Sequence, residues 1–438
     1  MRLALPVPPL AHDFRAARSL LARLDSARRH AWVPMQRSLL SHGGMPKSAS
    51  QGTWALAANG FRPFFLLAAV FASAIVPLWI LVVAGVLRPP GYLDATSWHA
   101  HEMVLGYAVA VIAGFLLTAV GNWTKRETLV GTGLLALSAL WCLGRMAMVF
   151  AGTLPRGLPA IVDLAFLPAL IVVLARPLIA ARNRRNLIML GILGALFVAN
   201  VVVHLDALGL MAVGAARHAC LVAIDVVVLV ILIIAGRVFP MFTRNATGVT
   251  TIRSSPLLDV LTIAGMGVLT GVDIFAAERA GAAVLAGAVA VLAIARAARW
   301  GTRHTIRHPL LWILHVGYGW LALGLLLRAF AGFDPAVPGS LATHALTVGA
   351  IGSLTLGMMA RVSLGHTGRA LVASRPTVWA FGAITAAAFA RVIVPLLAPG
   401  WYFTALVAGA GFWTAAFVLY LVAYLPVLVT PRVDGKPG

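Results

Sequence analysis

The chain has 438 residues, of which 61% are hydrophobic and only 11% are charged. Soluble domains are about 45–50% apolar and about 25% charged, so this composition excludes an ordinary soluble protein and predicts a lipid-embedded one. The net charge of +21 is typical of arginines that keep cytoplasmic loops inside, so we expect a lipid bilayer and no nucleic acid as a partner.

Residues 1–52 are rich in arginine and lack the apolar segment and cleavage site of a signal peptide. We predict a basic cytoplasmic tail there, then a twelve-span membrane domain over residues 53–431 and a short cytoplasmic tail over residues 432–438. A span needs about 20 largely apolar residues. The chain contains twelve such runs, at residues 61–87, 99–121, 128–150, 158–175, 186–205, 216–239, 257–275, 280–298, 309–329, 341–362, 378–397 and 402–429.

Alternate connections between these runs carry most of the basic residues, beginning with Lys125 and Arg126 after the second run. The other connections carry mostly single arginines such as Arg88. Cytoplasmic loops hold the excess of Lys and Arg, so we predict that both termini are cytoplasmic. The expected fold is all-α, a polytopic transmembrane bundle of about twelve helices.

The most informative stretch is residues 98–103, Trp-His-Ala-His-Glu-Met, at the start of the second run. Ionisable groups within a membrane are costly and therefore indicate function. In the predicted orientation, five histidines reach the outer ends of their spans. They are His99, His101, His204, His218 and His344. A single terminal histidine often only bonds a carbonyl, but five at one level favour a metal or haem, because imidazole is a common metal ligand.

Helical spacing adds constraints to this picture. His99 and His101 are about 200° apart on a helix, so both face one site only if the helix begins after His99. His315 lies about 9 Å into the ninth run from the inner side. Asp225 shares a face with His218 and either orients that imidazole or forms a salt bridge or helix–helix hydrogen bond.

Two further expectations concern polar and proline positions within the runs. Arg145 and Asp163 stand at similar depths on consecutive runs, so we expect them to pair across a hairpin. Pro240 should stop or kink the sixth helix, because proline removes a backbone donor. Signatures of a P-loop, a Rossmann fold, an HExxH zinc site and a CxxCH haem attachment are missing from the sequence. A noncovalent haem b needs only axial ligands and a pocket.

Five segments together resemble the NnrS family. Asn-Gly-Phe-Arg-Pro-Phe-Phe at 59–65 is followed by the 98–103 stretch and by Ala-Gly-Phe-Leu-Leu-Thr-Ala-Val-Gly-Asn-Trp-Thr at 113–124. Gly-Arg-Val-Phe-Pro-Met-Phe-Thr-Arg-Asn at 236–245 and residues 344–369 complete the set. The likeness extends over about residues 55–430. One departure is that Gly121 and Lys125 flank Asn-Trp-Thr, where the family is expected to have proline and glycine.

The resemblance implies a multi-pass protein of the bacterial inner membrane that contains haem and copper and is associated with nitric oxide, nitrosative stress and denitrification. His99, His101, Glu102 and His344 stand within the matching motifs. We expect haem b between the outer ends of spans 2 and 10. The full predicted set adds His204, His218 and His315 from their depth. It is His99, His101, His344 and His315 as cofactor ligands, His204, His218, His99 and His101 as metal ligands with His315 as a further candidate for copper, and Glu102 and Asp225 as orienting or proton-path groups.

The expected function is to bind or detoxify nitric oxide. If the protein is an enzyme, we expect a haem-dependent nitric oxide oxidoreductase. The electron donor is unknown, either a quinol or none. Two alternatives remain: a haem- or metal-handling accessory protein without turnover, and a secondary transporter. Transporters usually have matching halves with broken helices near the midplane. In this sequence no halves match, and the polar residues gather at one end.

Overall fold

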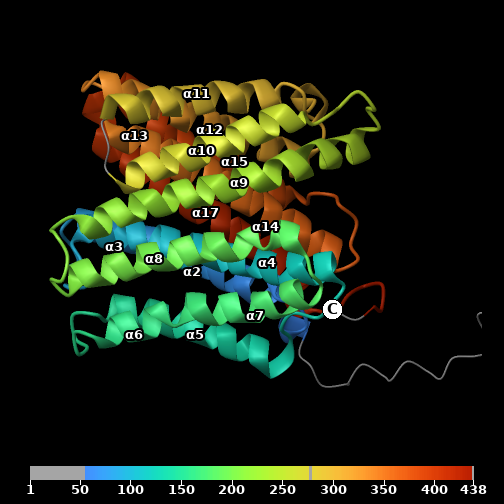
Figure 1. Ribbon diagram of the computed structural model, residues 1–438, viewed down its shortest axis with the longest axis horizontal. Coiled ribbons are helices and arrows are strands. Elements are labelled where there is room, and N and C mark those ends of the chain that lie inside the picture. The colour runs from blue at the N-terminus through green and yellow to red at the C-terminus, as the bar shows by residue number, and fades with distance from the viewer. Residues whose placement is uncertain (1–54, 276–278, 437–438) are drawn as a thin grey trace, which may run out of the picture. The chain divides into compact units, whose positions relative to one another are not determined.

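The computed structural model describes residues 55–275 and 279–436, so the predicted basic tail lies outside the described residues. The described elements are all helical (Figure 1). They are α2 (Phe61–Val83), α3 (Ala95–His101), η3 (Glu102–Ala108), α4 (Val109–Thr124), α5 (Gly131–Val149), α6 (Leu158–Leu164), α7 (Phe166–Ala180), α8 (Ile188–Ala207), α9 (Ala215–Thr247), α10 (Pro256–Ile274), α11 (Arg279–Ala297), α12 (Pro309–Phe333), α13 (Gly339–His344), η6 (Ala345–Gly352), α14 (Ser353–His366), α15 (Arg375–Ala388), η7 (Phe389–Ile393), α16 (Val394–Leu397) and α17 (Tyr402–Val429). Short 3₁₀ turns complete the set: η2 (Ala55–Ala57), η4 (Arg184–Asn186), η5 (Thr302–His304) and η8 (Pro399–Trp401).

Twelve helical stretches in the described residues are long and apolar enough to cross a membrane, and each coincides with a predicted run. The prediction of an all-α, twelve-helix bundle is therefore confirmed. Several spans are composite. α3, η3 and α4 form the second (Ala95–Thr124), α13, η6 and α14 form the tenth (Gly339–His366), and α15, η7 and α16 lie within the eleventh (Arg375–Leu397). The cytoplasmic location of the termini stays a prediction.

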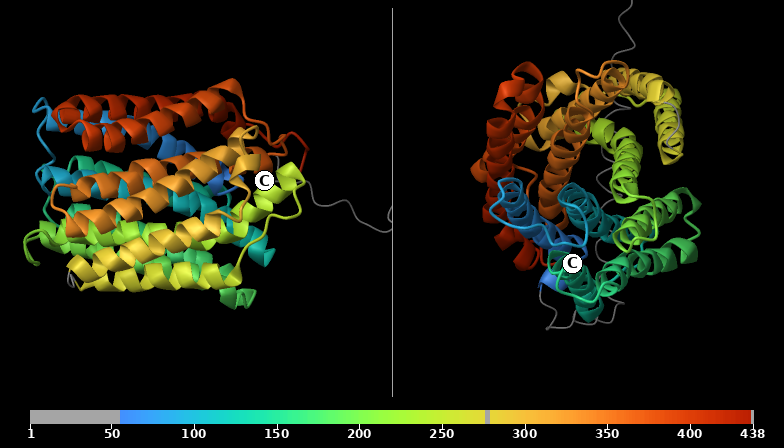
Figure 2. Two further views of the ribbon diagram at one scale, coloured as in Figure 1. Left: turned by 90° about the horizontal axis from the view of Figure 1, so that it is seen from above. Right: turned by 90° about the vertical axis from the view of Figure 1, so that its left-hand side faces the viewer.

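The helices run side by side between two ends of the bundle. α3, α6 and α13 lie at one end, which we call the α3 end, and the C-terminus lies at the other, which we call the C-terminal end (Figure 1). The right panel of Figure 2 looks onto the α3 end, where the blue segments of α2 and α3 lie beside red and orange helices. Spans far apart in sequence are thus neighbours, and α2 packs along α17.

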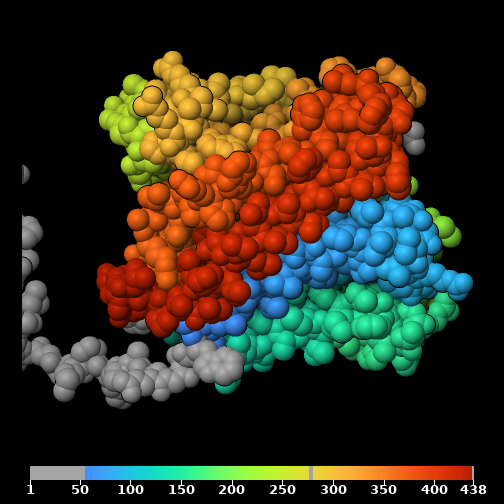
Figure 3. Space-filling model, turned by 180° about the vertical axis from the view of Figure 1, so that it is seen from behind, coloured from blue at the N-terminus to red at the C-terminus, as the bar shows by residue number. Residues whose placement is uncertain are grey.

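Burial separates central spans from peripheral ones. In the second span 83% of the most apolar window is buried, against 22% in α10, so the second span lies inside the bundle and α10 at its edge. Figure 3 shows one outer face, formed by α17 in red, α2 in blue and α5 and α6 in teal. Exposed apolar side chains on α17, such as Phe412 and Val422, are what a lipid-facing helix requires.

The sixth span corrects one expectation. α9 does not stop at Pro240 but continues to Thr247, where Gly248 ends it in the left-handed conformation, so a stop at Pro240 is wrong and a kink there stays a prediction. Proline costs a helix only one backbone donor, and transmembrane helices tolerate it because neighbouring groups satisfy the freed carbonyl.

Two polar anchors fix the positions of α2 and α3. Asp94 caps α3 by accepting hydrogen bonds from the backbone N–H groups of Thr96 and Ser97, each at 3.0 Å. At the C-terminal end, Arg62 of α2 donates to the carbonyls of Leu428 and Thr430, at 2.8 and 2.7 Å. These carbonyls belong to the last turn of α17, whose backbone has no further helical donors. The cap on α3 sets the position of both histidines in that helix.

Candidate metal centre and histidine pair

The structure gathers four of the five predicted histidines into two separate groups at the α3 end. His101, Asp163 and His204, from α3, α6 and α8, form a group that we call the triad. His99 and His344, from α3 and α13, lie within electrostatic range of each other and form a group that we call the histidine pair. The sequence placed all five histidines at one level and assigned His99 and His101 to both haem and copper, whereas the structure places these two histidines in different groups.

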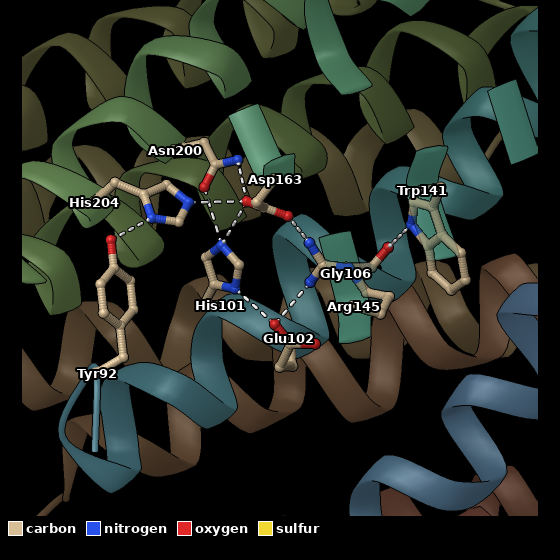
Figure 4. Close-up of polar contacts among 9 residues, drawn as sticks. All are labelled: Tyr92, His101, Glu102, Gly106, Trp141, Arg145, Asp163, Asn200 and His204. Carbon is tan, nitrogen blue, oxygen red and sulfur yellow. Dashed lines mark hydrogen bonds and ion pairs between the residues drawn. The ribbon is translucent and has the colours of Figure 1, made fainter. Parts of the chain in front are cut away.

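The triad converges through one atom of each side chain (Figure 4). His101 Nε2 lies 3.3 Å from Asp163 Oδ2, and His204 Nε2 lies 3.0 Å from the same oxygen. All three atoms lie within 4.8 Å of one another, and all three residues are buried. Tetrahedral ligands at about 2.0–2.1 Å from a metal stand about 3.3 Å apart, so these separations suit a metal ion as well as hydrogen bonds.

The other nitrogen of each triad histidine has a partner of its own. His101 Nδ1 lies 2.8 Å from Glu102 Oε1, and His204 Nδ1 lies 3.0 Å from the hydroxyl of Tyr92. Burial raises the pKa of Tyr92 to about 12, so its hydroxyl keeps its proton. A hydroxyl can donate or accept, so Tyr92 can hold this imidazole with or without a metal on Nε2. Partners of this kind fix the ring orientation of metal-binding histidines.

Asn200 of α8 bridges the two sides of the triad. Its Oδ1 lies 2.9 Å from His101 Nε2, and its Nδ2 donates to Asp163 Oδ2 at 2.8 Å. The amide therefore holds a histidine from the second span against a carboxylate from the fourth. Because Asn200 itself is buried, it adds these two contacts without adding charge.

Arg145 of α5 is the cation of this network. It donates through Nη1 to Glu102 Oε1 at 2.7 Å and through Nη2 to Asp163 Oδ1. The expected pairing of Arg145 with Asp163 across a hairpin is therefore confirmed. Trp141, one turn earlier on α5, places its ring 6.0 Å from the guanidinium carbon and donates to the carbonyl of Gly106 at 3.2 Å.

Two glycines leave room for this network. A Cβ at Gly106 would stand 2.8 Å from Arg145 Nη1, and a Cβ at Gly144 would stand 3.0 Å from Asp163 Oδ1. A side chain at either position would displace a buried charged group. Both glycines therefore serve the close approach of the charged side chains.

The charges of the network do not balance with neutral imidazoles. Glu102 and Asp163 carry two negative charges, and Arg145 supplies one positive charge. An uncompensated charge in a buried site is costly. A second proton on His101 or a metal cation on the triad supplies the missing positive charge. The donor set of two imidazoles and one carboxylate suits copper, iron or zinc.

The histidine pair has a different environment. The ring of His99 stacks on Trp79 of α2, with ring centroids 4.5 Å apart, and its Nδ1 is buried without a hydrogen-bond partner among the described residues. His344 Nδ1 lies 2.7 Å from the carbonyl of Ser340 and therefore carries the proton, which leaves a lone pair on Nε2. Arg391 of η7 interacts electrostatically with both histidines.

The histidine pair offers the kind of donors that hold haem iron. They are two imidazoles on separate spans, and one has the Nδ1 to carbonyl hydrogen bond that orients many metal-binding histidines. Within residues 55–275 and 279–436, the buried Nδ1 of His99 has no hydrogen-bond partner that metal binding would have to displace. His101 suits this role less, because contacts within the triad network occupy both of its ring nitrogens.

Three π-helical segments mark these positions. η3 begins immediately after His101, η6 begins immediately after His344, and η7 contains Arg391. π-helical turns are rare and frequently occur at functional sites. Each segment shifts the helical phase, so the side chains beyond the histidines face different neighbours from those that a regular α-helix would give. Tyr107 of η3 and Thr355, just beyond η6, join these two spans by a hydrogen bond of 2.6 Å.

The other predicted residues lie apart from these groups. His218 has a buried Nε2 without a hydrogen-bond partner in the described part of the chain. Asp225 accepts a hydrogen bond from Arg328 Nη1 at 2.8 Å, so the salt-bridge alternative holds for it. His315 lies between the hydroxyls of Thr243 and Thr302, at 3.1 and 2.9 Å, near the C-terminal end.

Four functional candidates were missed in the sequence. Asn200 interrupts an apolar run, and this could have marked it as polar at the depth of the histidines. Arg391 likewise lies inside a predicted run, and its charge was a signal. Tyr92, in a loop, and Trp79, in an apolar span, carry no comparable signal, because only the packing of the spans brings them to a histidine.

Comparison with known families agrees with the extent of this bundle. The family model described as NnrS protein matches residues 55–432 of the chain. The match includes every residue of the triad and of the histidine pair. No curated protein matches the chain.

Proposed function

The chain belongs to the NnrS family, and on that premise we propose that it holds copper at the triad and haem b at the histidine pair and binds nitric oxide. The observation that carries the proposal is the convergence of His101, Asp163 and His204 on one buried point. We place the protein in the inner membrane of a bacterium, where it would serve resistance to nitrosative stress and denitrification.

Copper at the triad is supported by the geometry and the charge of the site. The two imidazole nitrogens and the carboxylate oxygen already stand at ligand-to-ligand separations. A cation there offsets the second carboxylate that Arg145 leaves unbalanced. Glu102 and Tyr92 would keep the two rings oriented through their Nδ1 atoms.

Haem at the histidine pair is supported by the buried, unpartnered Nδ1 of His99 and by the tautomer that Ser340 imposes on His344. Were both imidazoles to hold the iron, the haem would transfer electrons and Cu(I) at the triad would supply the affinity for a small diatomic gas; were only one to hold it, the open position on iron would supply that affinity. Nitric oxide, being small and uncharged, can reach such a site through lipid. The protein's own part is to fix the two imidazoles.

The site favours binding of nitric oxide over its reduction. Reduction to nitrous oxide consumes protons, which a nearby acid would have to deliver. Glu102 and Asp163, the carboxylates of the triad network, are both ion-paired with Arg145. Proton transfer from either would break a buried pair. We therefore propose a protein that captures nitric oxide, with turnover as a question for the experiment below.

The test is an optical spectrum of the purified protein, oxidised and reduced, with and without nitric oxide, together with metal analysis. The variants are His101→Ala and His204→Ala for the triad and His99→Ala and His344→Ala for the histidine pair. His315→Ala, a buried histidine near the other end, is the matched control. We expect the triad variants to lose copper and the pair variants to lose the Soret band, while the control keeps both.

Nitric oxide should shift the Soret band of the wild type, and gas analysis for nitrous oxide with a chemical reductant should report whether turnover occurs. Loss of haem in the control as well as in the pair variants would refute the assignment of the histidines. A wild-type protein that contains neither haem nor copper after expression in a host supplied with both would refute the function itself.

A further inference from the structure

Arg391 is a buried cation with unused hydrogen-bond donors beside the histidine pair. It lies in η7, on the eleventh span, and is only 7% exposed. Its Nη2 donates to the hydroxyl of Tyr402 at 3.2 Å, whose ring lies 5.2 Å from the guanidinium carbon. Nε and Nη1 are buried and have no hydrogen-bond partner in the described part of the chain.

No carboxylate balances this charge in the described part of the chain. Two other arginines of the α3 end differ in this respect, because the buried Arg145 contacts Glu102 and Asp163, and the half-buried Arg328 contacts Asp225 and Asp273. The groups that act on Arg391 are an uncharged phenol and, across the site, two imidazoles. A buried guanidinium without a counter-charge is costly, so its retention here needs a reason.

The position of Arg391 points to a ligand at the histidine pair. α13, which ends at His344, packs against η7. η7 also approaches α17 closely, because Gly409 would place a Cβ only 3.5 Å from the Cβ of Arg391. The side chain is therefore confined between α13, which carries His344, and α17. Unused donors held at such a place suit an acceptor that arrives with the ligand of the histidines.

We infer that Arg391 binds a carboxylate of the ligand held by His99 and His344, which under the proposed function is a propionate of haem b. A carboxylate matches a guanidinium in charge and planar geometry, and such hydrogen bonds are stronger than neutral ones. The propionates are the only anionic groups of haem b, so a buried arginine beside its axial ligands has one natural partner. This inference rests on the proposed function, because it takes haem as the occupant.

The experiment compares haem b with its dimethyl ester, in which both propionates are uncharged. Purified protein freed of haem is titrated with each compound, and the Soret band reports binding. We expect the wild type to bind haem b about 10- to 100-fold more tightly than the ester, the range for charged hydrogen bonds. Arg391→Met should lose most of this preference by weakening haem b alone. Tyr402→Phe, which removes only the neutral neighbour, should keep most of it.

The outcomes separate this inference from the proposed function. Equal affinity of the wild type for haem b and the ester would overturn the role of Arg391 while leaving haem binding intact. Failure of the wild type to bind either compound would overturn the proposed function instead. Because the wild-type comparison needs no substitution, equal affinity there would overturn the role of Arg391 even if Arg391→Met does not fold. Arg391→Lys should keep part of the preference through its charge.

Discussion

His99 and His101 are two residues apart on α3, yet their rings lie in different polar groups. His99 stacks on Trp79 of α2, whereas His101 meets Asn200 of α8 on the other side of the helix. The angle of about 200° between alternate residues of a helix accounts for this divergence. One short motif thus supplies a histidine to each of two groups, and these groups contact different sides of α3.

The first prediction is that the two sites can be emptied separately. Asp163→Asn should remove the metal of the triad, because an amide oxygen is a weaker ligand than a carboxylate, and should leave the haem spectrum in place. His344→Ala should remove haem and leave the metal. Metal analysis and optical spectra of both variants measure this. Loss of both cofactors in either variant, with the protein still folded by size-exclusion chromatography, would show that the sites are not independent.

The second prediction concerns Arg145. Arg145→Met leaves two buried carboxylates without their cation and should lower the free energy of unfolding by about 3–5 kcal/mol. Adding Glu102→Gln to this variant removes one of the stranded charges and should recover part of the loss. Thermal unfolding in detergent measures both. A single variant as stable as the wild type would mean that the network is hydrated or otherwise neutralised.

The third prediction concerns the stability cost of adding a side chain at Gly106, which borders Arg145. Gly106→Ala puts a methyl group 2.8 Å from Arg145 Nη1 and should cost about 1–3 kcal/mol of stability by overpacking. The control is Gly271→Ala on α10, where a Cβ meets nothing within 4 Å. There the change should be neutral or stabilise by about 0.5–1 kcal/mol, because alanine favours helix over glycine. If both variants unfold alike, steric crowding at Gly106 is not the cause.

The fourth prediction is a pH effect at the cap of α3. Burial opposes ionisation of Asp94, but hydrogen bonds from Ser97 and Thr96 outweigh it and lower its pKa. Because the pKa of Asp94 is lower in the folded state, the ionised cap makes its full contribution to folding stability above the unfolded pKa of about 3.9. This contribution is lost as the pH falls below that value. Asp94→Ala should cost about 1 kcal/mol at pH 7.

The matched control for the cap is Asp94→Asn, which keeps a capping oxygen but cannot titrate. It should remain close to the wild type at pH 7 and lack the loss that the wild type shows on acidification. Melting curves at pH 7 and pH 3 for the three proteins measure this. An alanine variant whose deficit is as large at pH 3 as at pH 7 would contradict the role of the charge.

The sequence predicted much of the fold because a helix that crosses lipid needs a continuous run of apolar residues, which is visible in the sequence. All twelve spans could be read from apolar runs, since each must satisfy its backbone alone. The pairing of Arg145 with Asp163 could also be read, because consecutive spans form a hairpin. The expected helix stop at Pro240 was wrong, because a proline ends a helix far less readily among packed spans than in water.

The lateral arrangement of the spans could not be read in the same way. Depth placed five histidines at one end but did not say which spans touch, so the triad and the histidine pair were not distinguished. The π-helical segments η3, η6 and η7 leave no periodic signature in an apolar run, because every face is hydrophobic. The sequence marks Arg391 and Asn200 as polar positions, but only their neighbours in the structure assign them to the histidine pair and to the triad.

The division of ligands along the chain has a consequence for synthesis. The triad draws on the second, fourth and fifth spans, so all its ligands exist once five spans have been inserted. The histidine pair is complete only after the tenth span has been synthesised, and Arg391 follows with the eleventh. A nascent chain therefore contains the whole triad when less than half of its length has been synthesised, and the whole histidine pair only near the end.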